Sequence, residues 1–259
     1  MKKFIAFILA LVFIFSLSAC SSDDAGSDLD YVTEKGKIVV GITEFAPMDY
    51  EENGEWVGFD ADMAKEFAEY LGVEVEFIVI DWDNKIFELD NKSIDVVWNG
   101  MTLTDKVKNA MGTSEPYCKN AQVVVVKSEV ADKYQDEASL AELVFAVEAG
   151  SAGKETVEAL GLTFTEVAYQ SDALMEVAAG TSDACVIDLL MAGAMIGEGT
   201  GYPDLTYTVS LTSEDYVVGF RKGSDLVEKF NQFWADACAE GTVLETAKKY
   251  GVQESVIIK

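Results

Sequence analysis

The sequence predicts an α/β protein of two lobes joined by two crossing segments. Two observations predict it. From Lys37 onward, short apolar runs of strand length alternate with amphipathic helical patterns, which is typical of parallel strands joined by helices. The same layout occurs twice, once in each half of the 259 residues. A chain of this length can form two lobes, each with its own core.

The first series supplies the strands and helices of the first lobe. Strands are expected at residues 38–40, 73–80 and 94–98, and helices at 61–70 and 84–89. Asp60 is expected to cap the first of these helices, and Gly72 to end it in the left-handed conformation. Two C-terminal helices, at 226–240 and 242–250, are expected to close this lobe.

The second series repeats the pattern, with strands expected at 143–147, 164–167 and 184–187 and helices at 153–160 and 171–179. A run of β-branched residues at 121–127 is expected to cross from one lobe to the other, and residues 215–221 are expected to carry the chain back. The predicted lobe 1 is residues 31–123 plus 215–259, and lobe 2 is residues 124–214. Two crossings are what a hinged, monomeric two-lobe protein needs in order to close on a ligand.

The N-terminus has the pattern of an export signal, with two lysines, an apolar stretch at 4–15 and small residues before Cys20. The stretch is shorter than the ~20 residues of a membrane span. Residues 1–19 are therefore predicted to be a signal peptide. Leu-Ser-Ala-Cys at 17–20 resembles the lipobox of bacterial lipoproteins, which implies a lipidated Cys20 at the outer face of the cytoplasmic membrane. Residues 20–30 would then be a flexible tether. Plain secretion without a lipid is the alternative.

Composition excludes several function classes. There are 19 Lys and Arg against 46 Asp and Glu, a net charge of −27, so no nucleic-acid partner is expected. There is no histidine, and Cys118, Cys185 and Cys238 are far apart, so we expect no metal, no cofactor and no catalytic activity. At most one disulfide can form, and Cys185 is expected to be a buried thiol.

Five segments resemble the family-3 solute-binding proteins of ABC importers. They are GKIVVG at 36–41, WVGFDAD at 56–62, IDVVWNGMTLT at 94–104, AGS at 149–151 and DACVID at 183–188. The resemblance implies a type II periplasmic-binding-protein fold with a hinged ligand cleft between the lobes. It also implies an amino acid or related amine as ligand, and ABC permease subunits as partners.

The resemblance also implies which residues bind the ligand. Gly100, Met101 and Thr102 would offer backbone groups and a hydroxyl. Ser151 and Ala152 would direct N–H groups at an anion from the start of a helix.

Asp188, at the end of a predicted strand, would take the ligand ammonium by a charge-assisted hydrogen bond. Phe45 and Trp82 would place aromatic rings against the ligand. Each of these residues could instead serve as a cap, a turn or core.

One position departs from the family pattern. Val107 stands where the family has an arginine that grips the ligand carboxylate, and Arg221 lies outside the implied cleft. The cleft would then hold three acids, Glu44, Glu148 and Asp188. This balance favours a basic amino acid, or an amine without a carboxylate. The alternative is that Lys106 or Lys108, with the N–H groups near Ser151, holds an ordinary carboxylate.

Two other function classes are the alternatives to a binding protein. A secreted dehydratase-like enzyme could share the fold, but the sequence has neither histidine nor a Gly-x-Ser-x-Gly motif. A sensor input domain would need a transmembrane segment and a signalling module after it, and none is expected in these 259 residues.

Overall fold

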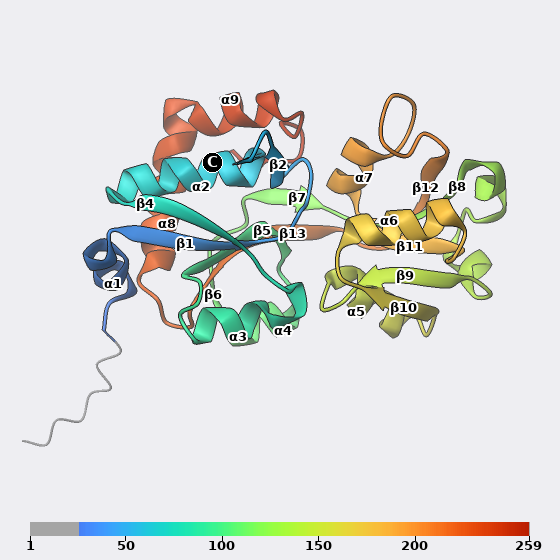
Figure 1. Ribbon diagram of the computed structural model, residues 1–259, viewed down its shortest axis with the longest axis horizontal. Helices are drawn as coiled ribbons and strands as arrows, with labels where there is room; N and C mark the ends of the chain where they lie inside the picture. The colour runs from blue at the N-terminus through green and yellow to red at the C-terminus, as the bar shows by residue number, and fades with distance from the viewer. Residues whose placement is uncertain (1–25, 259) are drawn as a thin grey trace, which may run out of the picture.

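The computed structural model describes residues 26–258, which form two lobes side by side, each built on one mixed sheet (Figure 1). The sheet of lobe 1 has the order β4-β1-β5-β13-β6, with β7 also pairing with β13. The sheet of lobe 2 has the order β10-β9-β11-β8-β12. A separate hairpin pairs β2 (Tyr50–Glu52) with β3 (Glu55–Val57). This is the two-lobe type II fold.

The strands of lobe 1 are β1 (Lys37–Ile42), β4 (Glu74–Val79), β5 (Val96–Thr102), β6 (Gly112–Thr113), β7 (Cys118–Asn120) and β13 (Glu214–Phe220). Its helices are α1 (Asp28–Lys35), α2 (Phe59–Leu71), the 3-10 turn η1 (Trp82–Asn84), α3 (Lys85–Asp90), α4 (Asp105–Ala110), α8 (Leu226–Glu240) and α9 (Thr242–Lys249). Strands β4, β1 and β5 are parallel as predicted, whereas β13 runs antiparallel to β5.

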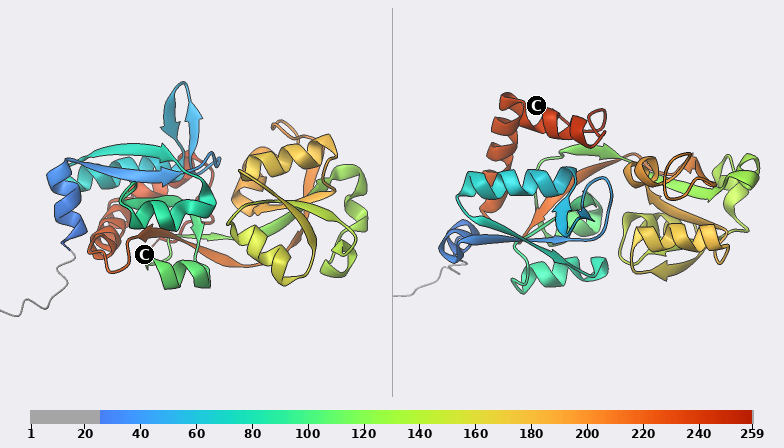
Figure 2. Two further views of the ribbon diagram at one scale, coloured as in Figure 1. Left: turned by 60° about the horizontal axis from the view of Figure 1, so that its bottom comes forward. Right: turned by 45° about the horizontal axis from the view of Figure 1, so that its top comes forward.

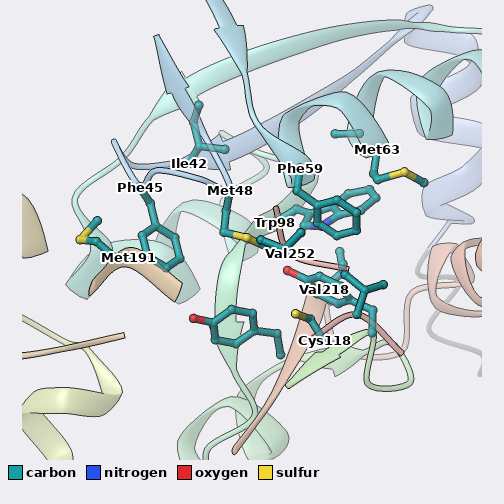
Figure 3. Close-up of a cluster of buried hydrophobic side chains, with 14 of the residues drawn as sticks. Ile42, Phe45, Met48, Phe59, Met63, Trp98, Cys118, Met191, Val218 and Val252 are labelled. Atoms are coloured by element: carbon teal, nitrogen blue, oxygen red, sulfur yellow. The ribbon is translucent and has the colours of Figure 1, made fainter. Parts of the chain in front are cut away.

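Alternation along β1 and β5 divides lobe 1 into two apolar layers. Val40 of β1 and Trp98 of β5 belong to the large cluster that includes α2 and α8. Val39 and Val97 face the other way, into the cluster beneath α3 and α4. Successive side chains of a strand point to opposite faces, so two layers of helices can cover one sheet. Figure 3 shows part of the larger cluster, with Trp98 among its labelled side chains.

Lobe 2 is organised in the same way. Its strands are β8 (Gln122–Lys127), β9 (Val144–Glu148), β10 (Thr163–Val167), β11 (Ala184–Asp188) and β12 (Leu205–Ser210). Its helices are α5 (Ala152–Ala159), α6 (Gln170–Ala179) and α7 (Leu189–Met195), with 3-10 turns η2 (Ser128–Lys133) and η3 (Glu137–Leu140). In β8, Val123 and Val125 pack with α6, while Val124 and Val126 pack with α5.

The chain passes between the lobes twice, at connections that lie side by side (Figure 2). The structure moves these crossings from the expected positions, because β8 lies wholly in the sheet of lobe 2 and β13 wholly in that of lobe 1. The crossings fall at Ala121, between β7 and β8, and at residues 211–213, between β12 and β13. Glu214 pairs with Asn120, and the Leu211 N–H donates to the Gln122 carbonyl at 2.8 Å.

The start of the described chain corrects the predicted tether. Helix α1 begins at Asp28, and the Ser27 hydroxyl caps it by accepting from the Asp30 N–H at 2.9 Å. Asp28 accepts from Arg221 Nε at 2.9 Å, so residues 28–30 belong to the fold. The predicted signal peptide and Cys20 lie outside the described residues. Between residues 26 and 258, no helix combines the length and apolar character that a membrane span requires.

The three cysteines of the folded part, Cys118, Cys185 and Cys238, are buried and unpaired. Burial raises the pKa of the Cys185 thiol above its ordinary value, in agreement with the expected inert thiol.

Candidate ligand-binding site

A cavity lies between the lobes, lined by residues from both. All ten residues that the sequence proposed for ligand binding line it: Glu44, Phe45, Trp82, Gly100, Met101, Thr102, Glu148, Ser151, Ala152 and Asp188. In both sheets these residues lie at or just beyond the carboxyl ends of parallel strands, where open α/β sheets place their ligands. The structure brings the ten together, and their individual roles stay predictions.

An aromatic wall comes from lobe 1. Phe45 and Trp82 are buried, and the Phe45 ring meets Tyr216 edge to face, with ring centroids 6.5 Å apart. Met191 of lobe 2 belongs to the same buried cluster as Phe45, and both line the cavity (Figure 3). Apolar contact therefore reaches across from one lobe to the other at this point.

Gly100 leaves room for the Phe45 ring, and its N–H is not available to a ligand. Its φ is +56°, and a Cβ there would lie 2.3 Å from Phe45 Cε1. Its N–H donates to Asp60 Oδ2 at 2.7 Å, as does the Tyr117 hydroxyl at 2.7 Å. The expectation that Asp60 caps α2 is therefore wrong, because Gly58 holds the cap position and the Asp60 carboxylate turns inward toward β5.

A second carboxylate, Asp49, is buried close to Asp60 beneath the cavity floor. Asp49 Oδ2 accepts from Asn99 Nδ2 at 2.7 Å, while Oδ1 of both acids has no hydrogen-bond partner among residues 26–258. Burial raises the pKa of both carboxyls, and the charge of Asp60 raises that of Asp49 further. Two acids placed in this way favour holding a proton.

The Thr102 hydroxyl is already committed to a protein partner. It donates to Glu214 Oε1 at 2.8 Å, and the same oxygen accepts from Asn120 Nδ2 at 2.7 Å and Gln122 Nε2 at 2.8 Å. Thr102 can therefore only accept a hydrogen bond from a ligand. Glu214 was missed by the sequence reasoning, because it lies at a crossing that was placed one residue too late.

Asp188 is buried at the end of β11 and held by donors from both lobes. Its Oδ1 accepts from the Tyr216 hydroxyl at 2.7 Å, from Gln122 Nε2 at 3.0 Å and from Asn120, and its Oδ2 accepts from Gln170. Burial raises its pKa. Asp188 is the N-cap residue of α7, but its side chain makes no cap hydrogen bond. The carboxylate is therefore oriented by a network and not by the helix.

Glu148 lies beside Asp188 and differs from it in its partners. It is 3% exposed, and its carboxyl group has a hydrogen bond with Gln170, the residue that also donates to Asp188. Burial raises its pKa to about 8, and the charge of Asp188 adds to the shift. Next to it, Ser151 caps α5 by accepting from the Lys154 N–H at 3.0 Å, so its hydroxyl serves the helix. The start of α5, including Ala152, borders the cavity.

Lys85 is the residue that sequence reasoning missed most clearly. It is 4% exposed at the start of α3 and lines the cavity. Its ammonium donates to the Trp82 carbonyl at 3.0 Å and, across the cleft, to the Gly150 carbonyl at 2.9 Å. Burial lowers its pKa to about 8, and the charge of Lys106 adds to the shift. Its position three residues after Trp82, in a segment expected near the cleft, was the available signal.

The other basic residues are less suited to grip a ligand. Val107 is buried at the cavity, as an apolar replacement for the family arginine. Lys106 lines the cavity but is half exposed, 3.8 Å from Asp83 Oδ1. Lys108 does not line it. Arg221 is buried at the opposite end of the sheet, where it binds Asp28 and Asp95.

The chain is similar to known proteins over most of its length. The family model for bacterial extracellular solute-binding proteins, family 3, matches residues 38–253. The chain is 27% identical to the arginine-binding extracellular protein ArtP of Bacillus subtilis, covering 96% of this chain and 98% of that one. It is 26% identical to the L-cystine-binding protein TcyJ of Escherichia coli, covering 94% and 92%.

Among solved structures, a mutant of the arginine-binding protein ArgBP from T. maritima superimposes with a TM-score of 0.81 at 31% identity. The match covers 86% of this chain and 99% of that one. The family model matches most of the chain and the fold agrees with that of a solved relative, and the chain therefore belongs to the bacterial extracellular solute-binding proteins, family 3.

Proposed function

We propose that this protein is the receptor of an ABC importer and binds an amino acid with a cationic side chain between its lobes. The observation that carries the proposal is the pair of buried acids, Glu148 and Asp188, on the lobe 2 wall of the cavity. Within the described residues neither carboxylate lies within ion-pair distance of a lysine or arginine, and a buried carboxylate of this kind favours an ammonium or guanidinium group. Glu44 and Glu155 line the same cavity and add negative charge.

The rest of the cavity fits such a ligand. Asp188 would hold the α-ammonium, because its network fixes both oxygens in place. Glu148, which has no cation within ion-pair distance among the described residues, would face a second positive charge. Phe45 and Trp82 would cover the aliphatic part and the cation, as aromatic faces do. The relatives named for arginine and for cystine support an amino acid as the ligand class.

A calorimetric panel tests this proposal. L-arginine, L-lysine, L-ornithine and L-histidine are expected to bind, and neutral amino acids of similar size to bind at least ~10-fold more weakly. Each binder at 100 times its Kd should add about 2.7 kcal/mol to the free energy of unfolding. Preference for neutral amino acids would overturn the cationic assignment. Absence of binding across amino acids and amines would overturn the receptor function itself.

An amine without a carboxylate is the second candidate ligand, and the absence of arginine from the cavity favours it. Comparing L-arginine with agmatine, its decarboxylated form, separates the two. Catalysis is not proposed, since the sequence holds no histidine. Incubating the protein with each binder and searching for products would expose an enzyme.

The mature protein is proposed to be a monomer, anchored by a lipid on Cys20 and closing at the two crossing connections. The lipobox-like segment at 17–20 supports the anchor. Cys20→Ala should release the protein from membranes, and its continued retention would argue against a lipid. Small-angle scattering should show a smaller radius of gyration on binding, with one chain per particle.

A further inference from the structure

The Lys85 ammonium is buried in the cavity with neutral partners only. Both of its hydrogen bonds go to backbone carbonyls, and within residues 26–258 no carboxylate lies within ion-pair distance of Nζ. The Trp82 ring lies beneath it, 4.5 Å from Nζ to the centroid. An ammonium has three donors, so one donor is left over, and the carboxylates of Glu148, Asp83 and Glu155 act on the charge only from beyond ion-pair distance. A buried cation of this kind is costly unless an anion joins it.

The cavity therefore has a positive end and a negative end. Lys85, from lobe 1, supplies the positive end, and Glu148 and Asp188, from lobe 2, supply the negative end. A ligand with an anionic and a cationic group matches both ends. A ligand with cationic groups only would leave Lys85 uncompensated and add repulsion to it.

Lys85 also connects the two lobes. Its acceptor, the Gly150 carbonyl, lies in the turn between β9 and α5, while Lys85 begins α3. The approach is close: a Cβ on Gly150, whose φ is +70°, would lie 2.6 Å from Asp83 Cα. The Lys85 contact can exist only while the lobes are together.

We propose that Lys85 receives the carboxylate of the amino-acid ligand, in place of the arginine absent at Val107, and links that contact to lobe closure through the Gly150 carbonyl. The inference rests on the proposed function and narrows it. It assigns the ligand carboxylate to a residue of α3, whereas the family arginine would stand at Val107 in α4. It also favours an amino acid over its decarboxylated amine.

Calorimetry with two matched pairs of probes tests the inference: L-arginine with agmatine, and L-lysine with cadaverine. The wild type should bind the amino acid at least ~30-fold more tightly than the amine. Lys85→Met should weaken amino-acid binding by about 10- to 100-fold, the range expected for a charge-assisted hydrogen bond, and change amine binding by less than ~3-fold. The preference for the carboxylate should collapse.

Two further variants isolate the charge. Lys85→Gln keeps a donor near Gly150 without a charge, so it should lose the preference as Lys85→Met does, and it replaces that variant should Lys85→Met unfold. Lys108→Met is the matched control, because its side chain is half exposed and does not line the cavity, and an exposed charge contributes little. It should change amino-acid affinity by less than ~3-fold.

The outcomes separate the inference from the proposed function. Equal losses for amino acid and amine in Lys85→Met would show a role in closure alone and overturn the carboxylate assignment. A wild type that binds agmatine as tightly as L-arginine would also overturn it, while leaving a receptor for amines. A wild type that binds none of the four probes would overturn the basic-ligand proposal and this inference with it.

Discussion

The two walls of the cavity bury charge of opposite sign and support it differently. On the lobe 2 wall, Asp188 is held by four side-chain donors from both lobes. On the lobe 1 wall, Lys85 has two backbone carbonyls and an aromatic ring. The network around Asp188 makes it a fixed anchor. Burial lowers the pKa of Lys85 to about 8, and within the described residues no carboxylate lies within ion-pair distance of its ammonium.

Under the proposed function, these opposite charges explain how a chain with Val107 at the position of the family arginine would recognise a zwitterion. The buried charges of the two walls are opposite in sign. A ligand that contacts both walls therefore gains the full electrostatic energy only when the walls are close together. Charge recognition and closure then depend on each other, because the buried groups meet their partners in the closed form. Four substitutions test this contrast between the two walls.

Removing the anchor should have the largest effect. Asp188→Ala would leave donors from Tyr216, Gln122 and Gln170 without their acceptor, each costing about 1–3 kcal/mol if it stays buried. We expect affinity for the best ligand to fall by ~100-fold or more and the free energy of unfolding by at least about 2 kcal/mol. Calorimetry and urea unfolding measure the two. Unchanged affinity would place the ammonium elsewhere.

Disturbing the aromatic part of the lobe 1 wall should come next. Gly100→Ala puts a Cβ 2.3 Å from the Phe45 ring at a φ of +56°, so the ring must move. We expect a loss of about 1–3 kcal/mol in unfolding free energy and weaker binding. Gly193→Ala in α7 is the control, because nothing lies within 4 Å of its Cβ, and it should be neutral or slightly stabilising. Equal behaviour of the two variants would contradict the role of Gly100 in leaving room for the ring.

Glu148 offers a pH test of the lobe 2 wall. Burial raises its pKa to about 8, so in the free protein below that pH it holds a proton, which a cationic ligand must displace. Affinity for L-arginine should therefore rise as pH increases from 6 to 8, with release of up to one proton. Calorimetry in buffers of different ionisation enthalpy measures the release. Glu148→Gln should flatten the profile and lower the arginine preference by ~10-fold. A profile that stays steep in this variant would assign the proton to another group.

The buried acids beneath the cavity should give the smallest effect on binding. Since burial raises the pKa of Asp60, its folded form keeps a proton that the unfolded chain releases. Stability from this group is present at low pH and is lost as pH rises from about 4 through the folded pKa, by up to about 1.4 kcal/mol per pH unit. Asp60→Asn should reduce that slope in urea unfolding at pH 5 and 7.5, and change ligand affinity little. An unchanged slope would leave Asp49 or another carboxyl as its cause.

Much of the fold follows from local pattern. Helix α8 has the predicted bounds, Leu226–Glu240, because its buried face repeats at helical spacing and Gly241 ends it with a φ of +88°. The crossings were placed wrongly for a physical reason. A run such as Gln122–Lys127 has the pattern of an apolar strand whether it lies in one sheet or passes between two. Only its pairing with other strands determines which of the two it does.

The site, like the fold, could be predicted from the sequence only in part. Ten cavity residues could be predicted from the sequence, because strand ends and helix starts are local features that converge in this fold. The sequence could not determine which groups are free to act. The Thr102 hydroxyl is held by Glu214, the Gly100 N–H by Asp60, and Lys85 is buried across from Gly150. These pairings join residues that are distant in sequence. Burial and charge depend on such neighbours, so the pairings follow from the packing of the two lobes and not from any local pattern.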